Sequence, residues 1–169
     1  QLNPIFFHYM TCKLPFVVAK WAMTADGHIS ASTGDSRWVS CEASRAQVHE
    51  YRHRLAAIMV GVNTVLADDP SLTCRRANGA AGNNPLRVVC DSHLRIPLSS
   101  QLVKPANQVP TRVYCCDPDP AKQASLSAAG AQVVAVPSDE QGRVSLPHVM
   151  SHLAENGTDS VFLEGGAQL

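Results

Sequence analysis

The chain has 169 residues, and its 14 lysines and arginines balance its 14 aspartates and glutamates, so the formal net charge is zero with neutral histidines. Charged residues make up 17% and apolar residues 45%, a composition typical of one folded domain and not of a disordered segment. The balanced charge gives no indication of a polyanion-binding surface, so we expect no nucleic-acid partner. No apolar run approaches the ~20 residues of a membrane span, so we expect no membrane partner.

Six cysteines are scattered along the chain without a C-x-x-C pair: Cys12, Cys41, Cys74, Cys90, Cys115 and Cys116. This pattern does not resemble a disulfide framework. We therefore expect reduced, mostly buried thiols in a cytoplasmic protein.

The first predicted element is a strand over residues 15–23, where P-F-V-V-A-K-W-A-M is almost continuously apolar, as in a strand buried on both faces. A short strand is expected over 28–32. Ser40 is a suitable N-cap for a helix that ends near residue 55, and a second buried strand is expected over 56–62. A short helical turn follows it.

The second half of the chain alternates strands with helices. Strands are expected over 86–90, 112–116, 132–136 and 160–163, with helices over about 121–129 and 146–155. This alternation predicts an α/β domain with a largely parallel central sheet. The sequence stops just after Gly165-Gly166, where a strand turns into a presumed helix, so we expect the natural protein to continue.

The segment His49-Glu50-Tyr51-Arg52-His53 fits H-E-x-x-H, the zinc-protease signature. The apolar stripe of this predicted helix consists of Ser44, Val48, Tyr51 and Leu55, so we expect His49 and His53 to face solvent. A third ligand is also missing, because position 59 is methionine. We predict no metal site and keep a zinc metalloprotease as an alternative.

The same helix carries a basic stripe of Arg45, His49 and Arg52 along the border of its apolar face. Arg75 follows an Asp-Asp-Pro turn and offers a second guanidinium. Two arginines from different segments suit a phosphorylated small molecule, although a solvated basic face would show the same pattern.

Lys20 and Gly165-Gly166 are two further candidates. Lys20 interrupts a buried run, so its ammonium must reach solvent, pair with an acid or meet a ligand. The two glycines after an apolar strand suit phosphate binding at a helix N-terminus, but the chain contains no G-x-G-x-x-G, so a Rossmann domain is not supported.

Several blocks together resemble one family: P-F-V-V-A-K-W-A-M-T-A-D-G, G-D-S-R-W-V-S, V-H-E-Y-R, V-G-V-N-T-V-L-A-D-D-P-S-L-T-C-R, N-P-L-R-V-V-C-D-S and V-F-L-E-G-G-A. That family is the reductase domain of bacterial riboflavin-biosynthesis bifunctional deaminase/reductase proteins of the RibD type. The resemblance implies a dihydrofolate-reductase-like fold, with a mixed, mainly parallel sheet flanked by helices. It also implies a connector from a missing N-terminal deaminase domain over 1–14, and a reductase domain over 15–169 that is incomplete at its C-terminus.

The resemblance implies NADPH-dependent reduction of 5-amino-6-(5-phosphoribosylamino)uracil to its ribitylamino counterpart, with hydride delivered to the ribose C1′. It places Ser36, Arg52, Leu72, Arg75 and Glu164 on the substrate, with the two arginines at the phosphate. It places Ala22, Trp38, Thr64, Asp68, Ser92 and Gly166 on the cofactor, although Trp38 would also suit a core and Thr64 and Asp68 could cap the short helix. Lys20 is the candidate catalytic cation.

The family also implies a homodimer when the domain is complete. No H-x-E followed by P-C-x-x-C occurs in this chain, so zinc deamination cannot reside here. A second alternative to the enzyme is a reductase-like module that binds nucleotide without catalysis.

Overall fold

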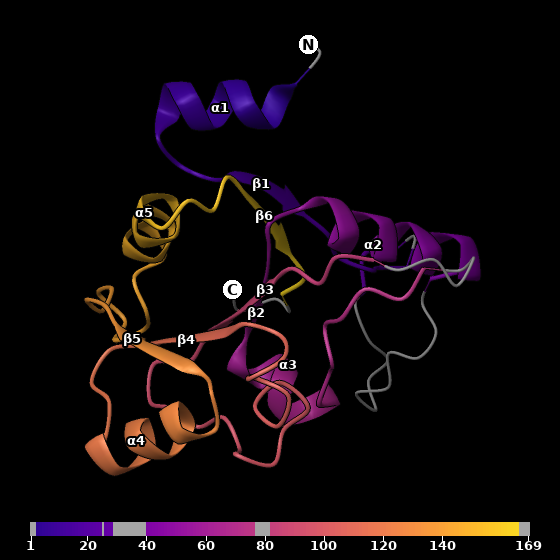
Figure 1. Cartoon of the computed structure of the whole chain (residues 1–169). Helices are drawn as coiled ribbons and strands as arrows, with labels where there is room; N and C mark the ends of the chain where they lie inside the picture. Colours follow the sequence, from indigo (N-terminus) through magenta and orange to yellow (C-terminus); the bar gives the residue numbers. More distant parts are fainter. Residues whose placement is uncertain (1–2, 25, 29–39, 77–81, 166–169) are drawn as a thin grey trace.

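The structure, a computed structural model, describes residues 3–24, 26–28, 40–76 and 82–165. Over these residues one sheet contains β1 Phe16–Ala19, β2 Ala57–Gly61, β3 Leu86–Cys90, β4 Thr111–Cys115, β5 Gln132–Ala135 and β6 Ser160–Leu163. The strand order is β1-β6-β2-β3-β4-β5, and every neighbouring pair is parallel (Figure 1). The predicted α/β class with a mainly parallel sheet is therefore confirmed.

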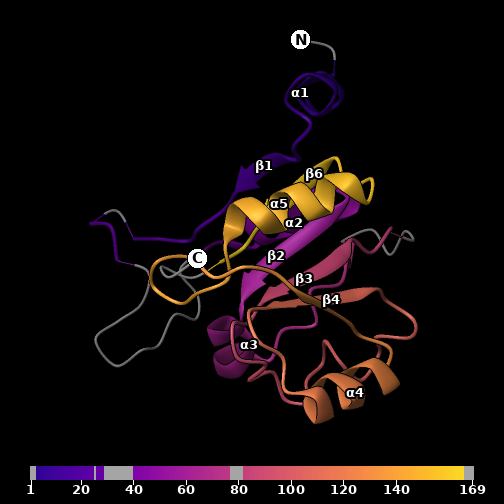
Figure 2. The same ribbon diagram turned by 90° about the vertical axis from the view of Figure 1, so that its left-hand side faces the viewer.

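The helices found in the described part of the chain are α1 Pro4–Cys12, α2 Glu42–Arg54, α3 Val62–Asp68, α4 Pro120–Ala128 and α5 Leu146–Glu155. Figures 1 and 2 show α5 on one face of the sheet and α3 and α4 on the other. One apolar cluster contains Val149 and Leu153 of α5, and a second contains Val65 of α3 and Leu126 of α4. The sheet is thus the middle of three layers.

The central strand β2 shows why both faces are covered. Ile58 and Val60 pack into the cluster of α3 and α4, while Ala57 and Met59 pack into the cluster of α5. Successive side chains of a strand point to opposite faces, so a strand covered on both sides needs an unbroken apolar run. The buried strand predicted over 56–62 is confirmed, one residue shorter at each end.

The prediction for residues 15–23 was wrong in length and in environment. β1 covers only Phe16–Ala19 and, in the described part of the chain, pairs with β6 alone, which leaves Val17 45% exposed. The apolar residues 21–23 lie beyond the strand and line a cavity. A hydropathy pattern cannot distinguish such a cavity wall from a buried strand.

The later strands and helices lie within one residue of their predicted bounds. Two predictions nearer the N-terminus need correction. The N-cap of α2 is Cys41, without a side-chain hydrogen bond, and not Ser40. His28 lies in no strand, and the other residues of the strand predicted over 28–32 lie outside the described residues.

Helix α1 was not predicted, because residues 1–14 were assigned to a connector. The Asn3 side chain accepts the Phe6 N–H at 3.2 Å, and Pro4 occupies the first turn. Asparagine followed by proline is a helix-start signal that the sequence already carried. Whether this segment connects to another domain stays a prediction.

All six cysteines are free thiols, but Cys115 alone is fully buried, and Cys12 and Cys41 are exposed. The expectation of mostly buried thiols is therefore wrong. Burial raises the pKa of Cys115 to about 11 and that of Cys90 to about 12, so both stay protonated at neutral pH. Among the residues described, none of the helices has the length and apolar character needed to cross a membrane.

Arg87 of β3 is a fully buried cation that ties two loops together. Its guanidinium donates to the carbonyls of Leu102 and Val109 at 2.9 and 2.7 Å, and to the Ser71 carbonyl at 3.4 Å. Burial lowers its pKa to about 10, so it remains charged at neutral pH. The loop after α3 is thus anchored to the segment between β3 and β4.

Candidate functional site

The carboxyl ends of the strands carry the main polar residues of the candidate site. Lys20 directly follows β1, and its N–H donates to the Leu163 carbonyl at 2.9 Å. Glu164 directly follows β6, and its N–H donates to the Met59 carbonyl at 3.0 Å. Because the described strands are parallel, these ends share one edge, where open α/β sheets bind their ligands.

A cavity of about 480 Å³ lies between the segment after β1 and the first turns of α2. Its wall includes Lys20, Trp21, Ala22, Ser44, Val48 and Tyr51. This volume is within the range of small-molecule sites, and the wall combines apolar, hydroxyl and cationic groups. Lys20 forms no ion pair with a carboxylate in the described part of the chain. Lys20 and Ala22, predicted for catalysis and cofactor binding, therefore face the same cavity.

Arg52 and Glu164 form a two-point ion pair, which the sequence did not indicate. Arg52 Nε donates to Glu164 Oε1 at 2.8 Å, and Arg52 Nη2 donates to Oε2 at 3.0 Å. Each side chain is 11% exposed. Arg52 Nη1 also donates to the Thr73 carbonyl at 3.1 Å. These contacts use three of the five N–H groups of a guanidinium, which leaves two for a ligand.

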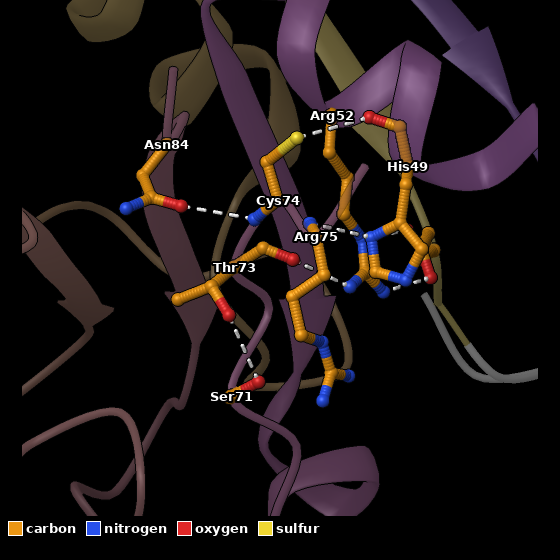
Figure 3. Close-up of polar contacts among 8 residues, drawn as sticks. His49, Arg52, Ser71, Thr73, Cys74, Arg75 and Asn84 are labelled. Carbon is orange, nitrogen blue, oxygen red and sulfur yellow. Dashed lines mark hydrogen bonds and ion pairs between the residues drawn. The ribbon is translucent and has the colours of Figure 1, made fainter. Parts of the chain in front are cut away.

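The loop after α3 contains two more of the predicted substrate residues, Leu72 and Arg75. Leu72 has a positive φ of 51°, an uncommon conformation for a residue with a side chain. Its side chain is 2% exposed and packs in the core, so Leu72 can reach a ligand only through its backbone. Arg75 is exposed, and in Figure 3 its side chain extends away from Arg52. The two arginines lie on adjoining segments, but the Arg75 guanidinium is directed outward.

The sequence predicts that the two histidines of the H-E-x-x-H segment face solvent, and this prediction is wrong. Both histidines face the loop that follows α3. His49 Nδ1 accepts the Arg75 N–H at 3.1 Å, and His53 Nδ1 accepts the Asn83 N–H at 3.0 Å (Figure 3 shows the first). Both side chains are half-buried. The apolar stripe of the helix did not predict this burial, because the loop that covers the two histidines is polar and contacts them through its backbone. Such a loop requires no apolar residues on the helix face that it covers.

Glu50, the residue that would activate water in a zinc protease, pairs instead with an arginine of that loop. Arg76 Nε donates to Glu50 Oε1 at 2.9 Å, which lowers the pKa of the carboxyl. Over the ranges that the structure describes, no three histidine, cysteine, aspartate or glutamate side chains gather into a possible metal site. The geometry of the segment is that of a loop anchor.

Burial lowers the pKa of His49, and the positive charges of Arg52 and Arg75 lower it further, while Glu164 opposes them. His49 is therefore neutral at pH 7. A neutral ring is what its contact requires, because an imidazole accepts a hydrogen bond only at an unprotonated nitrogen.

The remaining cofactor-side predictions are only partly described. Thr64 is half-buried on α3, and Asp68 is exposed at the end of that helix. The alternative that they cap α3 is wrong, since Gly61 is the N-cap, without a side-chain bond, and Asp69 is the C-cap. Ser36, Trp38 and Gly166 lie outside the described residues.

Ser92 follows β3 at the carboxyl edge of the sheet. Its Oγ accepts the Val144 N–H at 3.0 Å, and its carbonyl accepts the Cys116 N–H at 3.1 Å. Ser92 therefore holds the segment before α5 in place, and its hydroxyl proton remains for another acceptor.

Sequence reasoning missed two parts of the site. Tyr51 was assigned to the apolar stripe, but it is 36% exposed, lines the cavity and stacks on Phe162, with ring centroids 5.3 Å apart. The carbonyl of Thr73, which binds Arg52, could not be found from residue types, because every residue has a carbonyl.

A family model described as the RibD C-terminal domain matches residues 15–169. The chain belongs to this family. The riboflavin biosynthesis protein RibD of Actinobacillus pleuropneumoniae is 44% identical over 99% of this chain and 44% of that protein. The 2,5-diamino-6-ribosylamino-4(3H)-pyrimidinone 5′-phosphate reductase of Methanothermobacter thermautotrophicus is 39% identical over 92% of this chain and 69% of that protein.

Solved structures show the same fold. Acinetobacter baumannii RibD matches with a TM-score of 0.81 at 26% identity, over 98% of this chain and 44% of that one. The diaminohydroxyphosphoribosylaminopyrimidine deaminase/5-amino-6-(5-phosphoribosylamino)uracil reductase of Thermotoga maritima matches with a TM-score of 0.73 at 32% identity, over 96% and 42%. This RibD C-terminal domain thus spans less than half the length of its RibD relatives, and the expected dihydrofolate-reductase-like fold is confirmed.

Proposed function

We propose that this RibD C-terminal domain is the NADPH-dependent reductase of riboflavin biosynthesis, which converts 5-amino-6-(5-phosphoribosylamino)uracil to 5-amino-6-(5-phosphoribitylamino)uracil. The observation that carries the proposal is the match over 92% of the chain with an enzyme named as a pyrimidinone 5′-phosphate reductase. The Thermotoga maritima protein is likewise named as the uracil reductase.

The substrate side of the proposal rests on the Arg52–Glu164 pair and the loop after α3. A uracil ring offers N–H donors, for which Glu164 retains acceptor capacity beyond its two bonds to Arg52. A phosphate needs N–H donors and positive charge, which Arg52 supplies and to which Arg75 would add once its outward-directed guanidinium (Figure 3) turns towards the substrate. Leu72 offers its backbone, and Ser36 completes the proposed set from outside the described residues.

The cofactor side fits a nicotinamide group. The cavity of about 480 Å³ is large enough for the ring, and its wall offers apolar surface beside the Ser40 and Ser44 hydroxyls. We assign NADPH binding to Ala22 of this wall, to Thr64, Asp68 and Ser92 elsewhere at the same edge of the sheet, and to Trp38 and Gly166. NADPH supplies the hydride that reduces C1′ of the opened sugar.

Two residues at the edge of the sheet would promote the reduction, Lys20 through its charge and Glu164 by positioning the substrate. Lys20 holds an ammonium in the wall of the cavity, where a cation polarises the carbonyl or imine of the opened sugar and stabilises negative charge as it develops. Glu164 and Lys20 follow adjacent strands, so the ring and the reacting carbon would be held beside each other. The cytoplasmic location, the homodimer and the N-terminal deaminase partner expected from the sequence belong to the same proposal.

The test combines the purified protein with NADPH and the phosphoribosylaminouracil and follows the loss of nicotinamide absorbance. We expect oxidation that depends on the pyrimidine, and transfer of deuterium from C4-deuterated NADPH to C1′ of the product. Tight NADPH binding without turnover would contradict the proposal and favour a non-catalytic nucleotide-binding module. No pyrimidine-dependent oxidation and no NADPH binding would exclude both.

A further inference from the structure

The H-E-x-x-H segment of α2 has no part in the proposed chemistry, but both of its histidines bind backbone N–H groups of one loop. We propose that His49 is a positioning residue for substrate binding, and that its Nδ1 fixes the backbone of Arg75 so that this arginine is presented to the substrate phosphate. The inference rests on the proposed function, because the phosphate contact of Arg75 belongs to it.

The contact between His49 and Arg75 determines the tautomer of the imidazole. A backbone N–H can only donate, so Nδ1, which lies 3.1 Å from the Arg75 nitrogen, must carry the lone pair. The ring proton of the neutral imidazole is then on Nε2. Protonation of Nδ1 would place two donors against each other and break the contact.

Two residues of α2 hold three consecutive loop residues. The His49 carbonyl accepts from Cys74 Sγ at 3.3 Å, and Arg52 Nη1 donates to the Thr73 carbonyl at 3.1 Å. His49 and Arg52 are three positions apart and therefore lie on the same face of the helix. Residues 73–75 are thus fixed against α2, the helix that also carries Arg52 (Figure 3).

The surroundings of the ring keep the contact intact at neutral pH. The charged groups around His49 are Arg52 on its own helix, Arg75 on the loop and Glu164 after β6. Burial and the two arginines hold the pKa of His49 below its usual value. The two cations that the proposal assigns to the phosphate also keep the ring neutral.

His53 is a matched control within the same helix. It is half-buried like His49 and accepts one backbone N–H in the same way, but from Asn83 and not from Arg75. A variant of His53 therefore reports on a lost histidine–backbone bond in general, without removing the contact to Arg75.

The experiment compares His49→Asn with His49→Gln. Asparagine carries its Oδ1 on Cγ, where histidine carries Nδ1, so it can still accept the Arg75 N–H. Glutamine carries its amide one bond further out and cannot accept it in the same place. We expect His49→Gln to raise KM for the phosphorylated substrate roughly tenfold, with kcat changed less than threefold, because the hydrogen bond that fixes the Arg75 backbone is lost.

Three comparisons complete the test. His49→Asn is expected to keep KM within threefold of the wild type, and His53→Gln to do the same. The dephosphorylated nucleoside is expected to show no difference between His49→Gln and the wild type. Amide hydrogen exchange is expected to be faster at Arg75 in His49→Gln, but not in His49→Asn.

Equal KM values in wild type and His49→Gln, or equal losses with both substrates, would overturn the proposal. Unchanged exchange at Arg75 in His49→Gln would also overturn it. If the wild type does not turn over the pyrimidine at all, the proposed function fails, whereas the exchange measurement still tests the contact. If His49→Gln does not fold, His49→Asn provides the test. This variant retains the acceptor, so a rise in its KM for the phosphorylated substrate, but not for the dephosphorylated nucleoside, would contradict the proposed role.

Discussion

Arg52 and Glu164 lie 112 positions apart in the sequence, yet the guanidinium of one binds both carboxylate oxygens of the other, at 2.8 and 3.0 Å. The pair joins α2 to the end of β6. Each group therefore holds the other in one orientation before any substrate arrives, which is how a site is made rigid.

Replacing Arg52 by alanine is expected to weaken both stability and substrate binding. Glu164 would be left 11% exposed without its partner, so unfolding by urea should show a loss of about 2–3 kcal/mol. KM for the phosphorylated substrate should rise roughly tenfold or more. The double variant Arg52→Ala/Glu164→Ala should lose less stability than the sum of the single variants, and strict additivity would contradict the coupling.

Lys20→Met tests the cation in the cavity wall with a side chain of similar length. Single-turnover hydride transfer should slow about 100-fold, because a charge that stabilises the transition state is removed, while NADPH binding by fluorescence titration changes little. Lys104→Met, at an exposed lysine outside that wall, is the control and should retain the wild-type rate. A wild-type rate in Lys20→Met would show that the ammonium has no catalytic part.

Gly130 and Gly142 separate two costs of adding a side chain. Both have positive φ, 93° and 73°, so alanine is strained at either position. A Cβ at Gly142 meets nothing within 4 Å, whereas a Cβ at Gly130 would lie 2.9 Å from the Asn107 nitrogen and closer still to its side chain. Denaturant unfolding should show a loss of about 1 kcal/mol for Gly142→Ala and roughly 3 kcal/mol for Gly130→Ala. Equal losses of stability in the two variants would mean that the loop around Asn107 can shift to make room for the added Cβ without cost.

Stability should fall in mildly acidic solution because of two histidines. Burial lowers the pKa of His49, and burial and then Arg112 lower that of His152, which lies 2.9 Å from the Tyr114 hydroxyl. With folded-state values below the ordinary 6.5, the unfolded chain binds more protons, so this stabilisation is complete above pH 6.5 and is lost as the pH falls through the folded-state values.

The measurement is the unfolding free energy from pH 7.5 to 5, above the range where carboxyl groups titrate. In the double variant His49→Asn/His152→Asn, which keeps a polar group in place of each Nδ1 but cannot titrate there, the decline should be shallower. An identical decline in the double variant would show that other groups cause it.

Much of the fold could be predicted because apolar periodicity and strand length are local properties. The runs at Ala57–Gly61, Leu86–Cys90 and Ser160–Leu163 are mostly apolar because those strands are covered on both faces, and helices occupy parts of the intervals between them. The run over 15–23 misled the same reasoning, since its last four residues line a cavity.

The sequence by itself determined the residue types of the site, since arginines, Glu164 and Lys20 could be recognised within ordered motifs. Only the tertiary structure decided their partners: Arg52 with Glu164, His49 with the Arg75 backbone and Glu50 with Arg76. Two of these contacts link α2 to a polar loop, and the loop bonds partly through peptide groups that every residue shares. Such contacts depend on which distant segments the fold brings together. The order of side chains along the sequence does not specify this, because the peptide groups that form the contacts are the same at nearly every position.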